Sequence, residues 1–180
     1  RCRTMAIDEK KLIAACKRND ARSQRLLYET YAPKMLSVCL RYAEDRETAY
    51  DYLQEGFIKV FSSLSTFGFE GSFEGWMRKI FTHTALEHLR RNDLLKESLD
   101  IDDTEDVPDT DSSALENISA DELMEIIAEL PAGFRTVFNM YAIEGYSHKE
   151  IGEALGISES TSRSQFARAR RLLQKRLSEI

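Results

Sequence analysis

The chain has 180 residues, of which 42% are hydrophobic and 31% charged, and its formal net charge is −6 at pH 7. This length predicts one or two small domains of a soluble globular protein. No apolar run reaches membrane-spanning length and the first residues lack the apolar centre of a secretion signal, so we expect no membrane insertion and a cytoplasmic location.

The first 45 residues carry the pattern of two helices. Asp8 is expected to cap the first. Its apolar stripe consists of Leu12, Ile13 and Cys16. The second helix should open at Asp20, be interrupted or restarted by Pro33, and end near Ala43. Its expected buried side consists of Leu26, Leu27, Tyr28 and Tyr31. Because no strand-like alternation occurs anywhere in the chain, the sequence predicts an all-α fold.

A third helix is expected over residues 46–63, with two distinct faces. The apolar face, which belongs in a core, comprises Leu53, Phe57, Val60, Phe61 and Leu64. A second stripe is acidic and amide-bearing and comprises Asp51, Gln54, Glu55 and Ile58. From the residues alone this stripe fits a solvated helix face or a surface that binds a partner with complementary arginines.

A fourth helix should follow the glycine-containing loop and be capped by Ser72. Its core side comprises Phe73, Trp76, Met77, Ile80 and Thr84. A polar, basic stripe comprises Lys79, Thr82, His83, Arg90 and Arg91. Basic side chains beside aromatic rings suit single-stranded nucleic acid, whose bases stack and whose phosphates need neutralising. The alternative, which we favour for Trp76, is that the aromatic residues are plain core.

The negative charge of the chain is concentrated in one region. Thirteen acidic residues and no Lys or Arg lie between Glu97 and Glu129, whereas the rest of the chain holds 25 basic and 18 acidic residues. The polar run that contains Pro108 shows neither helical nor strand periodicity, so we expect a flexible, self-repelling linker over residues 96–118. This charge distribution predicts two basic helical domains joined by an acidic linker.

Residues 147–176 have the pattern of a helix, a tight turn and a longer basic helix. Ser147 and Glu150 have capping-box spacing, Gly156 can end the first helix, and Ser158 can cap the second. Such a pair of helices suits the major groove of DNA, with Arg and Gln side chains reading bases in its second helix. A charge-laced, solvated surface helix is the alternative.

Small and hydrogen-bonding residues come first in that second helix and arginines come later, which suits base edges and then phosphates. The candidate DNA-binding residues are Ser158, Ser160, Thr161, Arg163, Ser164, Gln165, Arg168 and Arg171.

Catalytic and metal-binding motifs are missing from the sequence. It contains no phosphate-binding loop, no His-Glu-x-x-His and no nucleophile elbow. His83 and Glu87 lie one helical turn apart, but two such residues more often form a surface contact than an acid/base or metal pair. Cys2, Cys16 and Cys39 are odd in number and widely spaced, which favours free thiols. We therefore expect no enzyme, no metal and no cofactor.

These features together resemble the sigma-70 family of bacterial transcription initiation factors, and its small extracytoplasmic-function (ECF) group. Residues 26–91, which include the DYLQEGF motif, resemble region 2 of the family, and residues 130–173 resemble the second part of region 4. The resemblance implies a region 2 helical bundle over residues 8–95, a linker over residues 96–118 and a region 4 helix-turn-helix domain over residues 119–180.

The resemblance also assigns partners to the surfaces described above. Asp51, Gln54, Glu55 and Ile58 would dock on core RNA polymerase. The minus-ten promoter element would be recognised by Trp76, Lys79, Thr82, His83, Arg90 and Arg91. The second helix of the residue 147–176 unit would read the minus-thirty-five element. Factors of this group are commonly held by an anti-sigma protein, which is a further expected partner.

The chain departs from the family pattern at several positions of the helix-turn-helix. Gln165 and Ala167 stand where basic or polar residues are more usual, so the base preference cannot be carried over. Gly152 stands where alanine is usual, and Ser162 stands where a buried valine is usual. Two other functions stay open on sequence alone. One is a promoter-binding regulator that never joins polymerase, and the other is a helical adaptor that binds only protein. The acidic linker could also fold back on the arginines of the last helix and screen DNA binding, or serve only solubility.

Overall fold

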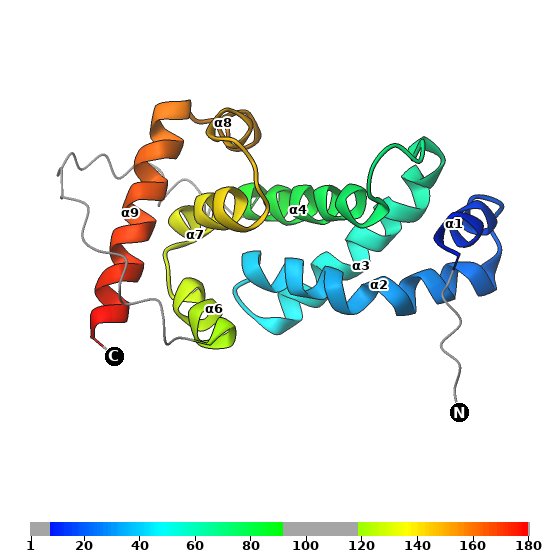
Figure 1. Ribbon diagram of the computed structural model, residues 1–180, viewed down its shortest axis with the longest axis horizontal. Helices are drawn as coiled ribbons and strands as arrows, with labels where there is room; N and C mark the ends of the chain where they lie inside the picture. The colour runs from blue at the N-terminus through cyan, green and yellow to red at the C-terminus, as the bar shows by residue number, and fades with distance from the viewer. Residues whose placement is uncertain (1–7, 92–118, 180) are drawn as a thin grey trace. The chain divides into compact units, whose positions relative to one another are not determined.

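The computed structural model describes residues 8–91 and 119–179, and within these ranges every regular element is helical. The all-α prediction is confirmed for this part of the chain (Figure 1). The predicted linker over residues 96–118 lies outside the described residues. The structure divides into two compact units, residues 1–85 and 86–180, and the division falls within one helix. The domain limits 8–95 and 119–180 therefore stay predictions.

The first unit starts three helices on aspartate caps. These helices are α1 (Glu9–Lys17), α2 (Ala21–Tyr42) and α3 (Arg46–Ser63). Asp8, Asp20 and Asp45 each accept a hydrogen bond from a backbone N–H three residues later, at 3.3, 2.8 and 2.8 Å. Each carboxylate satisfies an amide that has no partner within its helix, which fixes where the helix begins. The predicted caps Asp8 and Asp20 are confirmed.

Pro33 does not interrupt α2, which runs unbroken from Ala21 to Tyr42. The expectation that this proline breaks or restarts the helix was wrong. Proline removes one intrahelical donor, and here it lies on an exposed part of α2, where solvent can satisfy the carbonyl oxygen of Glu29. The burial pattern of the helix also differs from the prediction. Leu27 and Tyr31 are buried as expected, whereas Leu26 and Tyr28 are exposed.

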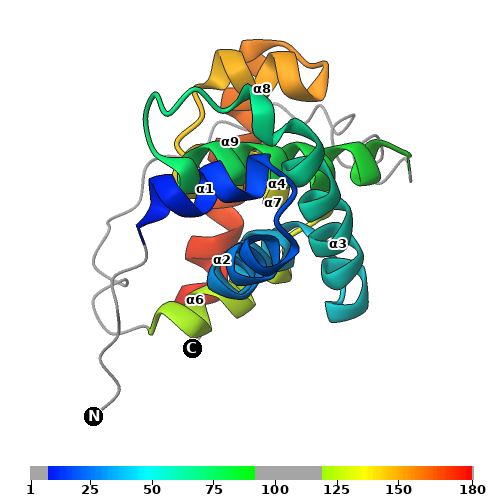
Figure 2. The same ribbon diagram turned by 90° about the vertical axis from the view of Figure 1, so that its right-hand side faces the viewer.

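The 3-10 turn η1 (Leu64–Thr66) and helix α4 (Phe73–Arg91) complete this part of the fold, and α4 is the helix that crosses the division. α2 packs against α1 and α3, as Figures 1 and 2 show from two directions. Side chains connect these helices to α4. The Phe73 ring meets Tyr31 of α2 edge-on at 5.5 Å between centroids, and Lys34 of α2 pairs with Glu74 at 2.6 Å.

Gly56 allows α3 and α4 to approach each other closely. A β-carbon at this position would overlap the ring of Phe81 on α4, so no other residue fits without a shift of that ring. The same ring meets Phe57 edge-on, at 5.2 Å between centroids and 75° between planes. An interior glycine weakens a helix, and here the loss is offset by close packing of two aromatic residues.

The second unit contains α6 (Ala120–Ala128), α7 (Ala132–Phe138), the π-helical turn η3 (Asn139–Ile143), α8 (His148–Leu155) and α9 (Glu159–Ser178). A capping box between Ser119 and Glu122 starts α6. The buried Arg135 of α7 donates a hydrogen bond to the carbonyl oxygen of Ala128, 2.8 Å away, and so satisfies the end of α6. The apolar core of the unit comprises Ile126, Ile127, Leu130, Phe134, Ala169, Leu173 and Leu177.

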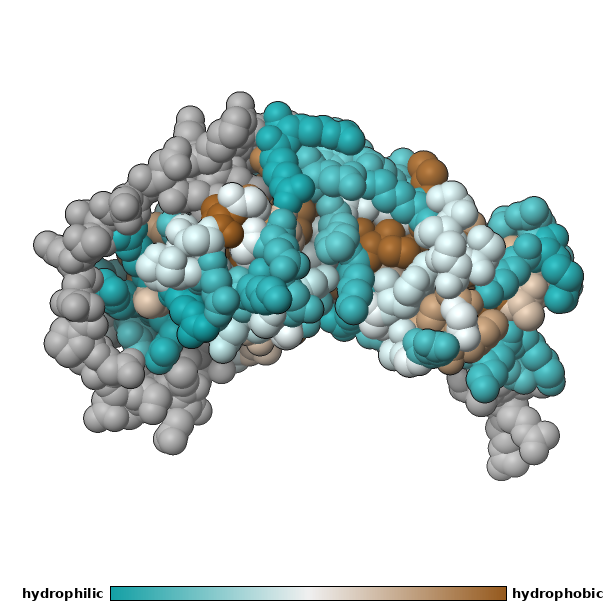
Figure 3. Space-filling model, turned by 90° about the horizontal axis from the view of Figure 1, so that it is seen from above, coloured by the Kyte–Doolittle hydropathy of each residue, from teal (hydrophilic) through white to brown (hydrophobic). Residues whose placement is uncertain are grey.

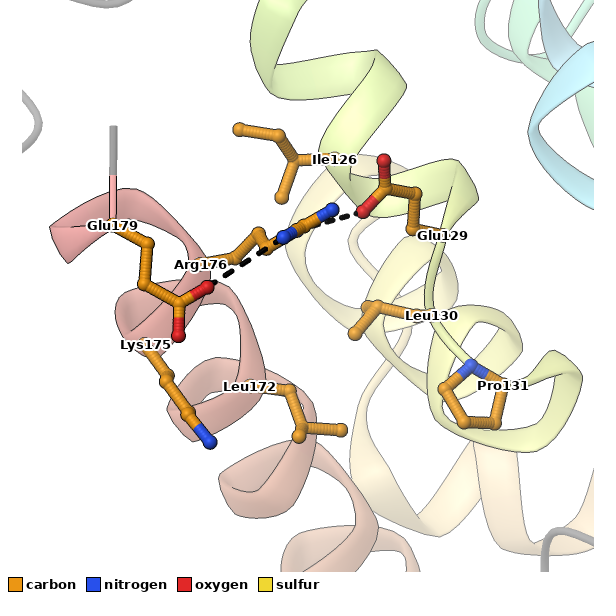
Figure 4. Close-up of a pocket in the computed structure, with 8 residues that line it drawn as sticks. All are labelled: Ile126, Glu129, Leu130, Pro131, Leu172, Lys175, Arg176 and Glu179. Atoms are coloured by element: carbon orange, nitrogen blue, oxygen red, sulfur yellow. Dashed lines mark hydrogen bonds and ion pairs between the residues drawn. The ribbon is translucent and has the colours of Figure 1, made fainter.

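A groove of about 330 Å³ lies where the last turns of α9 face α6 (Figure 4). Leu172, Ile126 and Leu130 supply apolar side chains to it. Arg176 donates a hydrogen bond from Nε to Glu129 at 2.9 Å and also pairs with Glu179 at 3.5 Å. These exposed ion pairs link the end of α9 to α6 but stabilise the unit only slightly.

Candidate nucleic-acid interface

The ends of α8 and α9 are set by the residues that the sequence indicated. Oγ of Ser147 accepts a hydrogen bond from the backbone N–H of Glu150 at 3.2 Å, and the Glu150 carboxylate accepts one from the N–H of Ser147 at 2.8 Å. Gly156 ends α8 in the left-handed conformation, with φ of 71°. Oγ of Ser158 then accepts the N–H of Thr161 at 3.0 Å. The predicted helix-turn-helix is confirmed.

The predicted DNA-binding residues of α9 and its N-cap Ser158 fall into three groups by burial. Four are exposed: Ser158, Ser160, Arg163 and Ser164. Three are partly buried: Thr161, Arg168 and Arg171. Gln165 is only 2% exposed, which argues against its prediction as a base-reading residue. It lies three residues after the buried Ser162 and four before the buried Ala169, on the side of α9 that packs against α7 and α8.

An ion pair orients the first exposed arginine of α9. The guanidinium of Arg163 donates a hydrogen bond to the carboxylate of Glu159, one helical turn earlier. This hydrogen bond and the charge of Arg163 lower the pKa of Glu159. The pair is exposed, so its effect is to orient the guanidinium rather than to stabilise the fold.

An aromatic cluster joins η3, α8 and α9. The ring of His148 stacks on Tyr141 at 4.2 Å and 11°, and meets the edge of Phe166 at 5.8 Å. Nδ1 of His148 and Oγ of Ser162 lie 2.9 Å apart and share a hydrogen bond. Burial, and after it the positive charge of Arg163, lowers the pKa of His148 from its ordinary 6.5. Sequence reasoning missed this cluster, because no periodicity connects residues so far apart in the chain.

The basic stripe of α4 is largely on the surface. Lys79, His83, Arg90 and Arg91 are exposed. Thr82 is 0% exposed, which argues against the prediction that it contacts DNA. Thr82 shares a helical stripe with Leu86 and Leu89, which are also buried.

Trp76 is half-buried among aromatic rings, as the core interpretation favoured. Its ring lies 5.3 Å from that of Phe67 and stacks on Phe73 at 5.6 Å. The loop that contains Phe67 is tied to α1, because Nζ of Lys17 donates a hydrogen bond to the carbonyl oxygen of Phe67 at 2.7 Å. The same ammonium lies 4.8 Å from the ring centroid of Phe69, an exposed residue with a left-handed φ of 61°. Such a φ is uncommon for a bulky residue and marks this loop as constrained.

The acidic stripe of α3 lies opposite its buried face. Asp51 and Gln54 are exposed, and Ile58 is 69% exposed. Glu55 is half-buried and pairs with Lys59 at 2.9 Å. An aliphatic residue as exposed as Ile58, beside acidic and amide groups, has the chemistry of a protein-binding surface.

Figure 3 shows one face of the molecule, on which the described residues are mostly hydrophilic and hydrophobic residues appear only in small patches. No cluster of His, Cys, Asp and Glu that could hold a metal occurs in residues 8–91 and 119–179. Within the same ranges, no helix combines the length and apolarity needed to cross a membrane.

Comparison with known proteins identifies the family. Residues 27–94 match the family model of sigma-70 region 2, and residues 120–173 match that of sigma-70 region 4. The chain belongs to the sigma-70 family. It is an RNA polymerase sigma factor, a class of protein that directs promoter-specific transcription initiation. The region 2 match contains α3 and α4, and the region 4 match contains the helix-turn-helix.

Relatives of this sigma factor include several of the ECF group. It is 27% identical over 183 residues to the RNA polymerase sigma-H factor of Pseudomonas aeruginosa, covering 96% of this chain and 95% of that protein. It is 32% identical over 158 residues to the ECF sigma factor SigE of Mycolicibacterium smegmatis, covering 85% of this chain and 61% of that protein.

Solved structures share the fold. A sigma factor of Bartonella quintana, solved with the anti-sigma factor NepR, aligns with a TM-score of 0.54 at 18% identity, covering 87% of this chain and 96% of that one. CnrH, solved with the cytosolic domain of CnrY, aligns with a TM-score of 0.51 at 19% identity, covering 93% of this chain and 96% of that one.

Proposed function

We propose that this sigma factor binds core RNA polymerase through the acidic stripe of α3, which consists of Asp51, Gln54, Glu55 and Ile58. The observation that carries this proposal is the exposure of Ile58, at 69%, one helical turn after the amide of Gln54 and the carboxylate of Glu55 on a helix whose other face is core. Burial of this side chain against a partner removes apolar surface from water, and the flanking polar groups can select a basic surface.

Two further surfaces of the chain bind promoter DNA in this proposal. The exposed residues of α4, Lys79, His83, Arg90 and Arg91, contact the minus-ten element where the strands separate, and Trp76 supports the loop beside them. The exposed and partly buried residues of α9, led by Arg163, read the minus-thirty-five element in the major groove. The factor lowers the cost of strand separation by capturing unpaired bases and performs no covalent chemistry.

The setting of this activity follows from the proposed partners. Bacterial RNA polymerase and promoter DNA are in the cytoplasm, so the factor acts there. An anti-sigma protein is a further proposed partner, because a sigma factor of the same fold was solved with the anti-sigma factor NepR.

Charge reversal on α3 tests the polymerase surface. The double variant Asp51→Arg and Gln54→Ala should lose co-precipitation with core polymerase and run-off transcription together, because it repels the basic partner and removes an amide contact. Glu44→Arg is the matched control, since it reverses another exposed acidic residue outside the stripe and should keep both activities. Full polymerase binding by the folded double variant would contradict the proposal.

A further inference from the structure

The helix-turn-helix is closed by a polar contact between its two helices. His148 is the first residue of α8, and its Nδ1 lies 2.9 Å from Oγ of Ser162 on α9. Ser162 is 0% exposed, so its hydroxyl is removed from solvent and depends on this partner. A hydrogen bond made away from water is geometrically demanding, because a small rotation of either helix would leave a buried polar group unpaired.

The histidine ring is itself held in place from two other elements. It stacks on Tyr141 of η3 at 11° between planes, and the ring of Phe166 of α9 meets it at 61°. Tyr141 and Phe166 also contact each other at 4.6 Å. These rings restrict the orientation of the imidazole, so the direction of Nδ1 is fixed before it meets Ser162.

The turn between α8 and α9 is also unusually close. A β-carbon on Gly152, one helical turn after His148, would lie 2.8 Å from the carbonyl oxygen of Ile157. The amide of Ile157 donates a hydrogen bond to the carbonyl of Gly152 at 3.0 Å, which holds this approach. Gly152 and Ser162 therefore lie at the same junction, where a close turn and a hydrogen bond connect the two helices.

We propose that His148 is a positioning residue for minus-thirty-five recognition, which acts by bonding Ser162 and fixing the orientation of α9 relative to α8. Ser162 precedes Arg163 and Ser164, whose exposed side chains depend on the rotation of α9 about its axis. The inference rests on the proposed function of α9 as the minus-thirty-five reader. His148 touches no base in this proposal and acts only through Ser162.

The test uses full-length factor bound to core polymerase and a promoter mapped from transcripts after overexpression. Run-off transcription is measured from that promoter and from a copy with a scrambled minus-thirty-five element, and the ratio is the readout. Loss of stability lowers both yields, whereas misplacement of α9 lowers the ratio. Two variants of His148 separate the effect of ring stacking from the effect of the hydrogen bond. His148→Phe keeps the stacking surface, and His148→Asn keeps a polar atom near the position of Nδ1.

His148→Phe and Ser162→Ala should each lower the ratio by about fivefold, the usual effect of one hydrogen bond. The double variant should lower it no further, because both changes break the same bond. His148→Asn should recover part of the loss. Ser178→Ala, a hydroxyl deletion in the last turn of α9, should keep the wild-type ratio.

Two results would overturn the inference in different ways. If the wild type prefers the intact element and His148→Phe and Ser162→Ala keep that preference, the positioning role is excluded and the function of α9 stands. If the wild type itself transcribes both templates equally, the proposed function of α9 fails and the inference fails with it.

Discussion

The ring of Phe81 on α4 occupies the space that a β-carbon of Gly56 on α3 would need. The contact lies within the first unit, where the edge-on contact of Phe57 with the same ring limits how far Phe81 can move. The position is therefore set by packing rather than by backbone conformation, since the φ of Gly56 is not positive.

Gly56→Ala should destabilise the protein by about 1–3 kcal/mol, because the added methyl group overpacks a rigid aromatic contact. Urea denaturation of the full chain measures the change. Adding Phe81→Leu should recover part of the loss. Gly75→Ala in α4 is the control, since its β-carbon would meet Ser72 at an ordinary 3.6 Å. Equal stability of the two alanine variants would contradict the packing argument.

Gly152→Ala should cost about 1 kcal/mol or more, although alanine is the better helix former by about 1 kcal/mol. The reason is that its β-carbon would lie 2.8 Å from the backbone oxygen of Ile157, which cannot move without disturbing its own turn. Thermal unfolding of the variant provides the measurement. A raised melting temperature would show that the turn relaxes freely and that glycine is not needed there.

Acidification should destabilise the second unit through His148. Its folded pKa lies below the ordinary 6.5, so the unfolded chain binds more protons, and stability falls as the pH drops through 6.5 toward the folded value. Urea denaturation at pH 7.5 and 5.5 measures this loss. His148→Phe should show a smaller difference between the two pH values. An equal difference would assign the loss to groups other than His148.

Gln165 and Ser164 should behave oppositely despite being adjacent. Gln165→Ala removes a buried amide and should cost about 1–2 kcal/mol in stability. Ser164→Ala changes an exposed residue and should leave stability within about 0.5 kcal/mol while weakening promoter binding. Unfolding curves and binding of the holoenzyme to promoter DNA distinguish the two effects. Full stability of Gln165→Ala would restore it as a candidate base-reading residue.

Local signals in the sequence predicted helix starts well. Asp8, Asp20, Ser147 and Ser158 all cap the helices that were expected to follow them, because a cap depends on a few neighbouring residues. The limits of α3 were also correct, since its apolar period is regular over its full length. Family resemblance then supplied the function that these helices alone could not indicate.

Burial on the sides of helices was predicted less well. Gln165 and Thr82 are polar and lie next to exposed neighbours, so their sequence positions gave no sign that other elements cover them. The prediction that Pro33 breaks α2 failed because the effect of a proline depends on whether solvent reaches the carbonyl oxygen that it leaves unpaired. The contact of His148 with Ser162 depends on the turn between them, and a short polar residue at a normally apolar position was its one available signal.

The bond from Lys17 to Phe67 has a practical consequence for work on this protein. Helix α1 precedes residue 27, where the region 2 match begins, yet its last lysine holds the loop that packs against Trp76. A version trimmed to the matched segment would retain every side chain assigned to the minus-ten element and still lose the support of the loop beside them. Defects seen in such a trimmed protein would result from the missing hydrogen bond of Lys17 to this loop and not from lost DNA contacts.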